Sequence, residues 1–296
     1  MLASLAALGA ALCWAIGGFI AVGPVRAIGA LAFNRLRMCI VAVGLVLAAT
    51  LLGGWATMDV HAAALLALSA AVGIVLGDTA LFLALGRLGP RRNTVVYSTN
   101  APLTALLGWF VLGEGLGTWT AAGIALVTAG VMLAVFFRAS AAPTHDWETV
   151  RGKLAVGVAI CLAAALCQAV GSIIAKPVMA SGVDPVAASA VRVGTAALMM
   201  VAMGLLPGQT LIPSAALQPR VLLPIVINGF LGLGLGTTLL LLGLAYGKAG
   251  VVATLSATSP ILVLPLQWAL TRKPPGAGAW AGAAVAVLGV ALIVNR

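Results

Sequence analysis

The chain has 296 residues, 62% of them hydrophobic and only 7% charged, and it carries a formal net charge of +10. A water-soluble surface needs several times this share of charged residues, so the composition excludes the one or two soluble domains that the length alone would allow. The basic residues stand singly or in pairs near the ends of apolar runs, which is typical of membrane topology determinants and not of a nucleic-acid-binding surface.

The apolar residues form ten runs of about 20 residues, the length of helix that crosses about 30 Å of hydrocarbon. A strand-based barrel would show alternating segments of about ten residues instead. In chain order, the first expected span ends at Gly23-Pro24, the second ends at Gly53-Gly54, and a tight basic connection, Gly89–Arg92, joins the third to the fourth. The ten expected spans are residues 3–23, 28–52, 63–87, 93–112, 117–137, 154–176, 186–206, 221–246, 250–270 and 277–295.

One polar stretch, residues 138–153, interrupts the apolar chain near its middle. It carries one of the two histidines and two of the six acidic residues. We interpret it as a linker between two domains of five spans each, residues 1–137 and 154–296.

The two domains share local sequence. Residues 11–21, ALCWAIGGFIA, align without gaps to residues 165–175, ALCQAVGSIIA, with seven identical positions of eleven. Five spans is an odd number, so the second domain enters the membrane from the opposite side, and such inverted repeats are typical of transporters with a site near the midplane. The sequence therefore predicts an all-α integral membrane fold: ten transmembrane helices, arranged as two inverted five-helix repeats around a central cavity.

The basic residues of the connections predict the orientation. Ten lysines and arginines lie in the odd-numbered connections and three lie on the side of the termini, when the intramembrane Arg35, Arg37 and Arg192 are set aside. The positive-inside rule then predicts that both termini lie outside the cytoplasm.

Proline interrupts the fourth and ninth expected spans. Pro102 and Pro260 each remove a backbone hydrogen bond within a span, so we expect a helix kink at each. The side chains before each proline are polar, and their edge either faces a cavity or bonds to its own helix; the sequence leaves both open. These side chains are Ser98, Thr99 and Asn100 in the first case and Ser256, Thr258 and Ser259 in the second.

Charged side chains deep in the spans carry the most information. Asp78 and Arg37 lie at a similar depth below the same basic face, so we predict that Asp78 pairs with Arg37 or Arg35. An unpaired acid in lipid costs several kcal/mol, so the pair is either structural or a proton or substrate switch. Arg192 has no acidic counterpart in its own domain. It either bonds to helix-end carbonyls or attracts an anionic group of a substrate.

Other polar and aromatic side chains could line a substrate cavity. Trp14 and Gln168 occupy equivalent places in the first and sixth spans. With the charged candidates, the substrate-binding residues that we expect are Trp14, Asp78, Tyr97, Asn100, Gln168, Arg192, Tyr246 and Ser256. The sequence has no catalytic constellation, no metal motif and no phosphate-binding loop, so we predict no enzyme activity, no cofactor and transport driven by a gradient.

Four segments, with their second-half echoes, carry a family resemblance. They are Trp14–Gly17, the arginine of the second span, Pro102 to Glu114, and Gly123 to Gly130. Together they resemble the ten-helix EamA branch of the drug/metabolite transporter superfamily, and are similar to its YddG group. The resemblance implies a bacterial inner-membrane exporter of amino acids or other small metabolites, in which spans 1, 3, 4, 6, 8 and 9 surround the cavity and spans 5 and 10 are peripheral.

Two features depart from that family. Arg272 stands where Glu114 would be echoed, which argues against a shared mechanistic acid. Relatives keep their termini in the cytoplasm, whereas the charges here predict the reverse.

We therefore expect a secondary transporter that works by alternating access, acts as a monomer surrounded by membrane lipid, and binds a small-molecule substrate, an amino acid, and no nucleic acid. Two alternatives stay open. One is a proton-coupled multidrug exporter, which needs an acid in the cavity. The other is a lipid flippase or an accessory subunit of a membrane enzyme.

Overall fold

The computed structural model describes residues 1–138, 153–205, 213, 216, 218–272 and 275–294. Ten helical stretches of this part of the chain are long and apolar enough to cross a membrane, which confirms the expected number of spans. They are Leu2–Ala21, Leu31–Leu51, Val60–Leu85, Arg92–Leu112, Thr118–Phe137, Leu154–Ala180, Pro185–Gly204, Pro219–Tyr246, Ala249–Leu266 and Ala277–Val294. Most of the expected linker, residues 139–152, lies outside the described residues.

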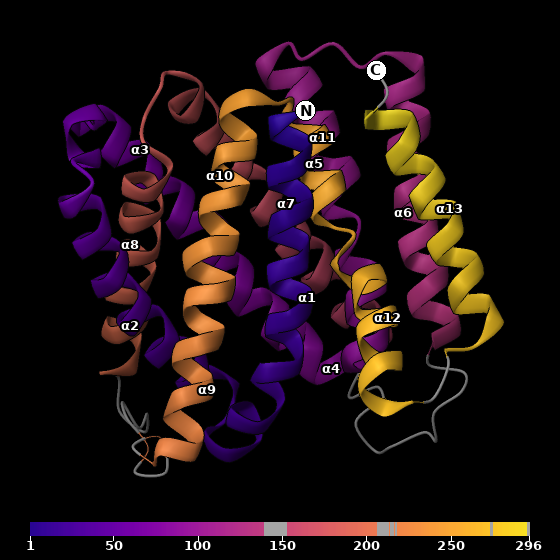
Figure 1. Cartoon of the computed structure of the whole chain (residues 1–296), viewed down its shortest axis with the longest axis horizontal. Helices are drawn as coiled ribbons and strands as arrows, with labels where there is room; N and C mark the ends of the chain where they lie inside the picture. The colour runs from indigo at the N-terminus through magenta and orange to yellow at the C-terminus, as the bar shows by residue number, and fades with distance from the viewer. Residues whose placement is uncertain (139–152, 206–212, 214–215, 217, 273–274, 295–296) are drawn as a thin grey trace.

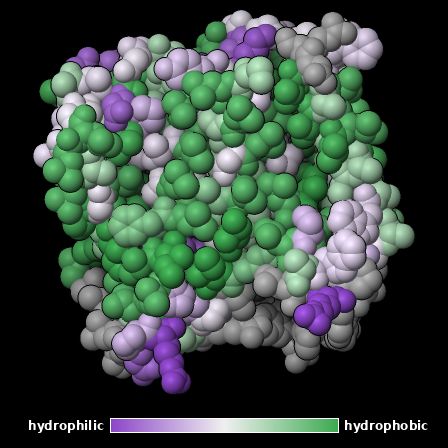
Figure 2. Space-filling view, viewed as in Figure 1, coloured by the Kyte–Doolittle hydropathy of each residue, from purple (hydrophilic) through white to green (hydrophobic). Residues whose placement is uncertain are grey.

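The helices run between the two ends of one bundle, with the start of the first helix and the end of the last at the same end (Figure 1). Figure 2 shows a broad apolar band between two more polar ends, as expected for a surface that faces lipid. The helical elements are α1 (Leu2–Ile28), α2 (Ala30–Leu51), η1 (Gly54–Thr57), α3 (Val60–Ala70), η2 (Ala71–Leu76), α4 (Gly77–Tyr97), α5 (Asn100–Leu112), α6 (Thr118–Arg138), α7 (Leu154–Ala180), α8 (Pro185–Gly204), α9 (Pro219–Gly229), η6 (Phe230–Gly236), α10 (Thr237–Tyr246), α11 (Ala249–Ser256), α12 (Ser259–Thr271) and α13 (Ala277–Val294).

Two expected helix ends differ from the structure. α1 continues through Pro24 and ends only before Gly29, whose φ of 81° a residue with a side chain rarely adopts. The backbone from Gly77 to Tyr97 is helical, so the helix does not stop at the expected connection, Gly89–Arg92. A proline removes one hydrogen bond of a helix but does not by itself end it, because neighbouring groups can satisfy the freed carbonyl.

The third and eighth spans each contain a π-helical segment, η2 and η6, at corresponding places. The first span of each half packs against the π-helical segment of the other half. The indole Nε1 of Trp14 donates to the carbonyl of Gly232 at 3.0 Å, and the hydroxyl of Ser69, just before η2, donates to the carbonyl of Gly171 at 2.6 Å. π-helical turns occur often at functional sites. Here η2 packs against α7 and η6 packs against α1.

The fourth and ninth spans are broken, not merely bent. α4 and α5 are separated by Ser98 and Thr99, and α11 and α12 by two residues ending at Thr258. The expected kinks at Pro102 and Pro260 are therefore interruptions that precede each proline. Both prolines lie in the first turn of the following helix, where a missing N–H leaves no hydrogen bond unmade.

The hydroxyls beside the breaks bond to their own helices. Ser98 Oγ donates to the carbonyl of Val95 at 2.7 Å, and Thr258 Oγ1 donates to that of Leu255 at 2.7 Å. Of the two arrangements that the sequence left open, bonding within the helix is formed. Ser98 nevertheless also borders the central cavity, so the two arrangements are compatible.

Close packing between α6 and α13 depends on glycine. The two helices lie side by side at one edge of the bundle (Figure 1). A Cβ added at Gly130 would lie 2.6 Å from the carbonyl oxygen of Gly282, and one at Gly289 would lie 2.7 Å from that of Gly123. Small residues allow such approach where lipid provides little hydrophobic drive between helices. The largest buried apolar cluster extends from this pair through α7, α10 and α11 to α1.

A set of polar contacts joins the two halves at the end of the bundle that holds the termini. The carboxylate of Glu114, after α5, accepts from the backbone N–H of Ala249 at 3.0 and 2.7 Å through its two oxygens. The ammonium of Lys248 donates to the carbonyl of Gly115. We call these four residues the Glu114 clasp. A carboxylate at the first turn of α11 also suits the positive end of the helix dipole.

Removing the clasp carboxylate should weaken the fold. Glu114→Ala is expected to lower the free energy of unfolding by about 1–2 kcal/mol, because the Ala249 N–H loses its charged acceptor. Glu114→Gln keeps an acceptor oxygen and should lose less. Thermal unfolding of the purified protein in detergent measures both variants, and wild-type stability of Glu114→Ala would contradict the contact.

Candidate functional site

A cavity of about 410 Å³ lies inside the bundle. This volume falls within the range of about 300–1,000 Å³ that is usual for small-molecule sites. Its described lining comes from α1, α2, η2, α4 to α8, η6 and α10 to α12, and includes no residue of α13, in agreement with a peripheral tenth span. The second and seventh spans, which were not expected at the cavity, contribute Arg37 and Arg192. α6 contributes only Val131. The polar and charged side chains of the lining are Arg37, Asp78, Thr94, Tyr97, Ser98, Asn100, Thr104, Gln168, Ser172, Arg192, Thr237, Ser256 and Ser259.

All but one of the expected substrate-binding residues border this cavity. Those that do are Trp14, Asp78, Tyr97, Asn100, Gln168, Arg192 and Ser256. Their role in binding stays a prediction. Tyr246 does not belong to the lining: it is the last residue of α10 and is 69% exposed. Tyr246 is the last residue of the expected eighth span as well, and its side chain lies at the end of the bundle.

The guanidinium of Arg37 is held by two buried amides. Its Nη1 donates to Asn228 Oδ1 at 3.0 Å and its Nη2 donates to Asn34 Oδ1 at 2.7 Å. It also lies 5.2 Å from the centre of the Phe33 ring. Asn228 in turn donates to the carbonyl of Gly17 at 2.7 Å. These hydrogen bonds connect α2, α9 and α1. They also use both terminal nitrogens of Arg37 for contacts within the protein.

Asp78 is not in direct contact with an arginine. The predicted ion pair with Arg37 or Arg35 is wrong for the described residues, because the hydrogen bonds of Arg37 go to the two amides instead. Of the cations around Asp78, Arg37 acts on it most strongly through space, followed by Arg192. Arg35 is buried, but it does not border the cavity. The carboxylate thus lies near the positive charges of Arg37 and Arg192 and near the side-chain amide of Asn34.

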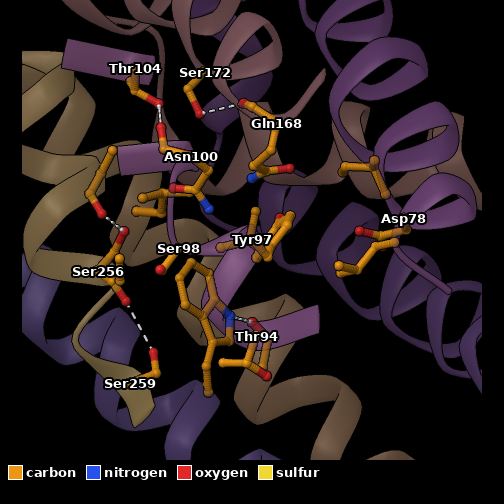
Figure 3. Close-up of a pocket in the computed structure, with 18 of the residues that line it drawn as sticks. Asp78, Thr94, Tyr97, Ser98, Asn100, Thr104, Gln168, Ser172, Ser256 and Ser259 are labelled. Carbon is orange, nitrogen blue, oxygen red and sulfur yellow. Dashed lines mark hydrogen bonds between the residues drawn. The ribbon is translucent and has the colours of Figure 1, made fainter. Parts of the chain in front are cut away.

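Neutral polar groups cover the side of the cavity next to the two helix breaks. Figure 3 shows Tyr97, Asn100 and Gln168 directed toward the same space, with Ser98 and Ser256 nearby. The hydroxyls there bond to backbone carbonyls: Thr104 Oγ1 donates to Asn100 at 2.7 Å, and Ser172 Oγ donates to Gln168 at 3.0 Å. The side-chain amides of Asn100 and Gln168 supply donors and acceptors to the cavity.

Comparison with protein families decides the class. The model of the EamA-like transporter family matches residues 1–136 and 155–295. The chain belongs to the EamA-like transporter family. It is therefore grouped with membrane transporters and not with enzymes.

Comparison with solved structures shows the fold of this EamA-like chain again. Twenty-six chains match, and one of them, described as "Crystal structure of protein", has a TM-score of 0.81 at 19% sequence identity. The match covers 99% of this chain and 96% of that chain. At this identity the likeness concerns the fold alone. A search of curated proteins found no match.

Two amides of this EamA-like transporter were not expected from the sequence. Asn34 and Asn228 are 0% and 3% exposed, and they are the groups that hold Arg37. A signal was present for each. Asn34 precedes Arg37 by three residues and so shares its helix face, and Asn228 is an isolated amide in an apolar span.

Removing the second amide should destabilise the bundle. Asn228→Leu is expected to lower the free energy of unfolding by about 2–3 kcal/mol, because Arg37 Nη1 and the Gly17 carbonyl both lose their partner in a buried place. The neighbouring Ile227→Leu, on an exposed apolar position, serves as the control. Thermal unfolding in detergent compares the two, and equal midpoints would argue against the role of Asn228.

Proposed function

We propose that the chain is a secondary transporter that exports amino acids or similar small metabolites across the bacterial inner membrane, as the YddG-type exporters do. The observation that carries the proposal is a polar cavity inside ten apolar helices, with a carboxylate and two guanidinium groups on its wall. Charged groups at membrane depth are unfavourable unless they are paired or serve a function.

The chemistry of the wall fits a zwitterion. An amino acid carries one anionic and one cationic group a few bonds apart. Arg192 and Asp78 offer charges of the opposite signs, and Gln168 and Asn100 offer neutral hydrogen-bonding groups. A purely apolar drug would leave these charges without partners, and this favours a small polar substrate.

We infer that alternating access arises from two inverted five-helix domains, residues 1–137 and 154–296, joined by the linker 138–153. Three observations support this. π-helical segments occur in the third and eighth spans, breaks occur in the fourth and ninth, and the family model matches two separate segments of nearly equal length. The protein would act as a monomer, and the charge distribution favours termini outside the cytoplasm.

Counterflow in proteoliposomes tests the function. Vesicles loaded with one unlabelled amino acid at a time should accumulate the same labelled amino acid when they contain the protein, and should not do so without it. Gln168→Ala should reduce this uptake, whereas Tyr246→Phe, outside the cavity lining, should leave it unchanged. Absence of counterflow for all twenty amino acids would overturn the proposal.

A second candidate is a proton-coupled multidrug exporter. The observation that favours it is that Asp78 has no direct ion pair within the described residues, which leaves the carboxylate open to protonation. In the same vesicles this candidate predicts uptake of a lipophilic cation driven by a pH gradient. Movement of a labelled lipid without movement of either soluble substrate would indicate a flippase instead.

A further inference from the structure

Arg192 is a cation on the cavity wall that the protein leaves without a hydrogen-bonding partner. It lies on α8, its side chain is 2% exposed, and it borders the cavity. Among the described residues its guanidinium has no hydrogen bond, and its buried Nε has no partner. A buried guanidinium without acceptors is strongly unfavourable. The position therefore favours a ligand that brings an acceptor into the cavity.

The other two intramembrane arginines do not share this combination. Arg37 borders the cavity, but Asn34 and Asn228 occupy its two terminal nitrogens. Arg35 is 6% exposed and has a buried Nη1 without a partner, but it does not border the cavity. Of the three, Arg192 alone both faces the cavity and has its hydrogen-bonding capacity free.

The charges around Arg192 favour an anionic group in the cavity. Gly73, on η2, lies beside the guanidinium, since a Cβ at that position would lie 3.7 Å from Arg192 Nη2, an ordinary van der Waals distance. Asp78 follows on the same span. It is the only acidic residue among the described lining, against the two arginines Arg37 and Arg192, so this wall carries one net positive charge. The electrostatic environment therefore favours the entry of a group with negative charge.

We propose that Arg192 binds the carboxylate of the transported substrate through its planar, fork-shaped guanidinium, while Asp78 faces the substrate's amino group. The inference rests on the proposed function and names the residue that selects the substrate class, metabolites with a free carboxylate. Two parallel N–H···O bonds from an arginine match a carboxylate geometrically, which a lysine ammonium does not. Amines of the same size satisfy Asp78 but bring no acceptor to Arg192, and neutral carboxamides bring one uncharged carbonyl oxygen in place of the two oxygens of a carboxylate.

The test compares each transported amino acid with its own carboxamide, which has a similar size but lacks the negative charge and has an NH2 group in place of one carboxylate oxygen. The wild-type protein should bind the acid about 10- to 100-fold more tightly than the amide, measured by competition in counterflow. Arg192→Gln should bind both with similar affinity, and Arg192→Lys should retain part of the preference. Arg35→Gln, which removes an equally buried cation outside the cavity, is the matched control and should discriminate like the wild type.

A second readout separates this inference from the proposed function. Thermal stabilisation of the purified protein in detergent by the acid, relative to its amide, requires binding but no transport. An acid preference that survives in Arg192→Gln, or that disappears equally in Arg35→Gln, would overturn the role of Arg192 even if counterflow is intact. Stabilisation by acids that depends on Arg192, without any counterflow, would support the carboxylate site and overturn the transport function alone.

Discussion

Gly171→Val is expected to destabilise the bundle strongly. A Cβ at Gly171 would lie 2.7 Å from the Cα of Gly73 and 3.0 Å from the carbonyl oxygen of Ser69. Both are backbone atoms of the neighbouring span, so no flexible side chain can move aside. Overpacking a core costs about 1–3 kcal/mol when side chains can adjust, and we expect about 3 kcal/mol or more here.

The same substitution also separates a buried bond between the two halves. Ser69 Oγ donates to the Gly171 carbonyl at 2.6 Å, and a wider helix separation would break this bond. The yield of monodisperse protein and its thermal midpoint in detergent measure the effect. Gly194→Val is the control, because a Cβ at Gly194 has no atom within 4 Å. If Gly171→Val and Gly194→Val had the same yield and thermal midpoint, the close helix approach at Gly171 would not be required for stability.

Neutralising Asp78 should destabilise the protein, and removing a second charge should partly restore it. Asp78→Asn leaves Arg37 and Arg192 on the cavity wall without a nearby negative charge. Removing the acid of a buried pair in direct contact costs about 3–5 kcal/mol, so we expect about 1–3 kcal/mol for this longer-range arrangement. The double variant Asp78→Asn with Arg192→Gln should be more stable than the sum of the single effects predicts, by about 1 kcal/mol.

Four proteins form the cycle: wild type, the two single variants and the double variant. Thermal or denaturant unfolding in detergent gives the stabilities, and counterflow gives the activity of each folded protein. Strictly additive stabilities, within about 0.5 kcal/mol, would show that the two charges do not interact. Loss of counterflow at unchanged stability in Asp78→Asn would assign the carboxylate a role in transport and not in the fold.

The ten spans could be predicted from the sequence, and all but one of the expected substrate-binding residues border the cavity, for the same physical reason. Lipid excludes polar groups, so run length marks the spans, and a polar residue inside a run, such as Gln168 or Asn100, must face another helix or a cavity. Tyr246 was the exception, because an aromatic residue near the end of a span is tolerated at the membrane interface as well.

The partners of the charged residues could not be predicted in this way. The sequence predicted that Asp78 and Arg37 lie at the same depth in the membrane. Depth alone does not decide which acceptor group forms hydrogen bonds with the guanidinium of Arg37. Asn34 lies one helix turn from Arg37, and Asn228 lies 191 residues later in the chain. The side-chain oxygens of these two residues, and not Asp78, accept the hydrogen bonds of Arg37. The π-helical segments were likewise hidden, because a shift in backbone register depends on the packing of neighbouring helices and not on local composition.

The Glu114 clasp has a consequence for the resting state of the transporter. α5 and α12 are both 13 residues long and occupy corresponding places in the proposed repeat. In that repeat Arg272 stands in the place of Glu114, and Pro90 stands in the place of Ala249. An arginine cannot accept the hydrogen bond and a proline has no N–H to donate it.

The end of the bundle away from the termini therefore lacks the residues for a second contact of this kind. Under the proposed orientation that end faces the cytoplasm, so opening toward the cytoplasm would leave the Glu114 clasp intact, whereas opening toward the exterior would break it. We expect the substrate-free transporter to favour the conformation whose cavity is open to the cytoplasm, where an exporter binds its substrate. The change to the outward-open conformation, which precedes release, would then require the binding free energy of the substrate.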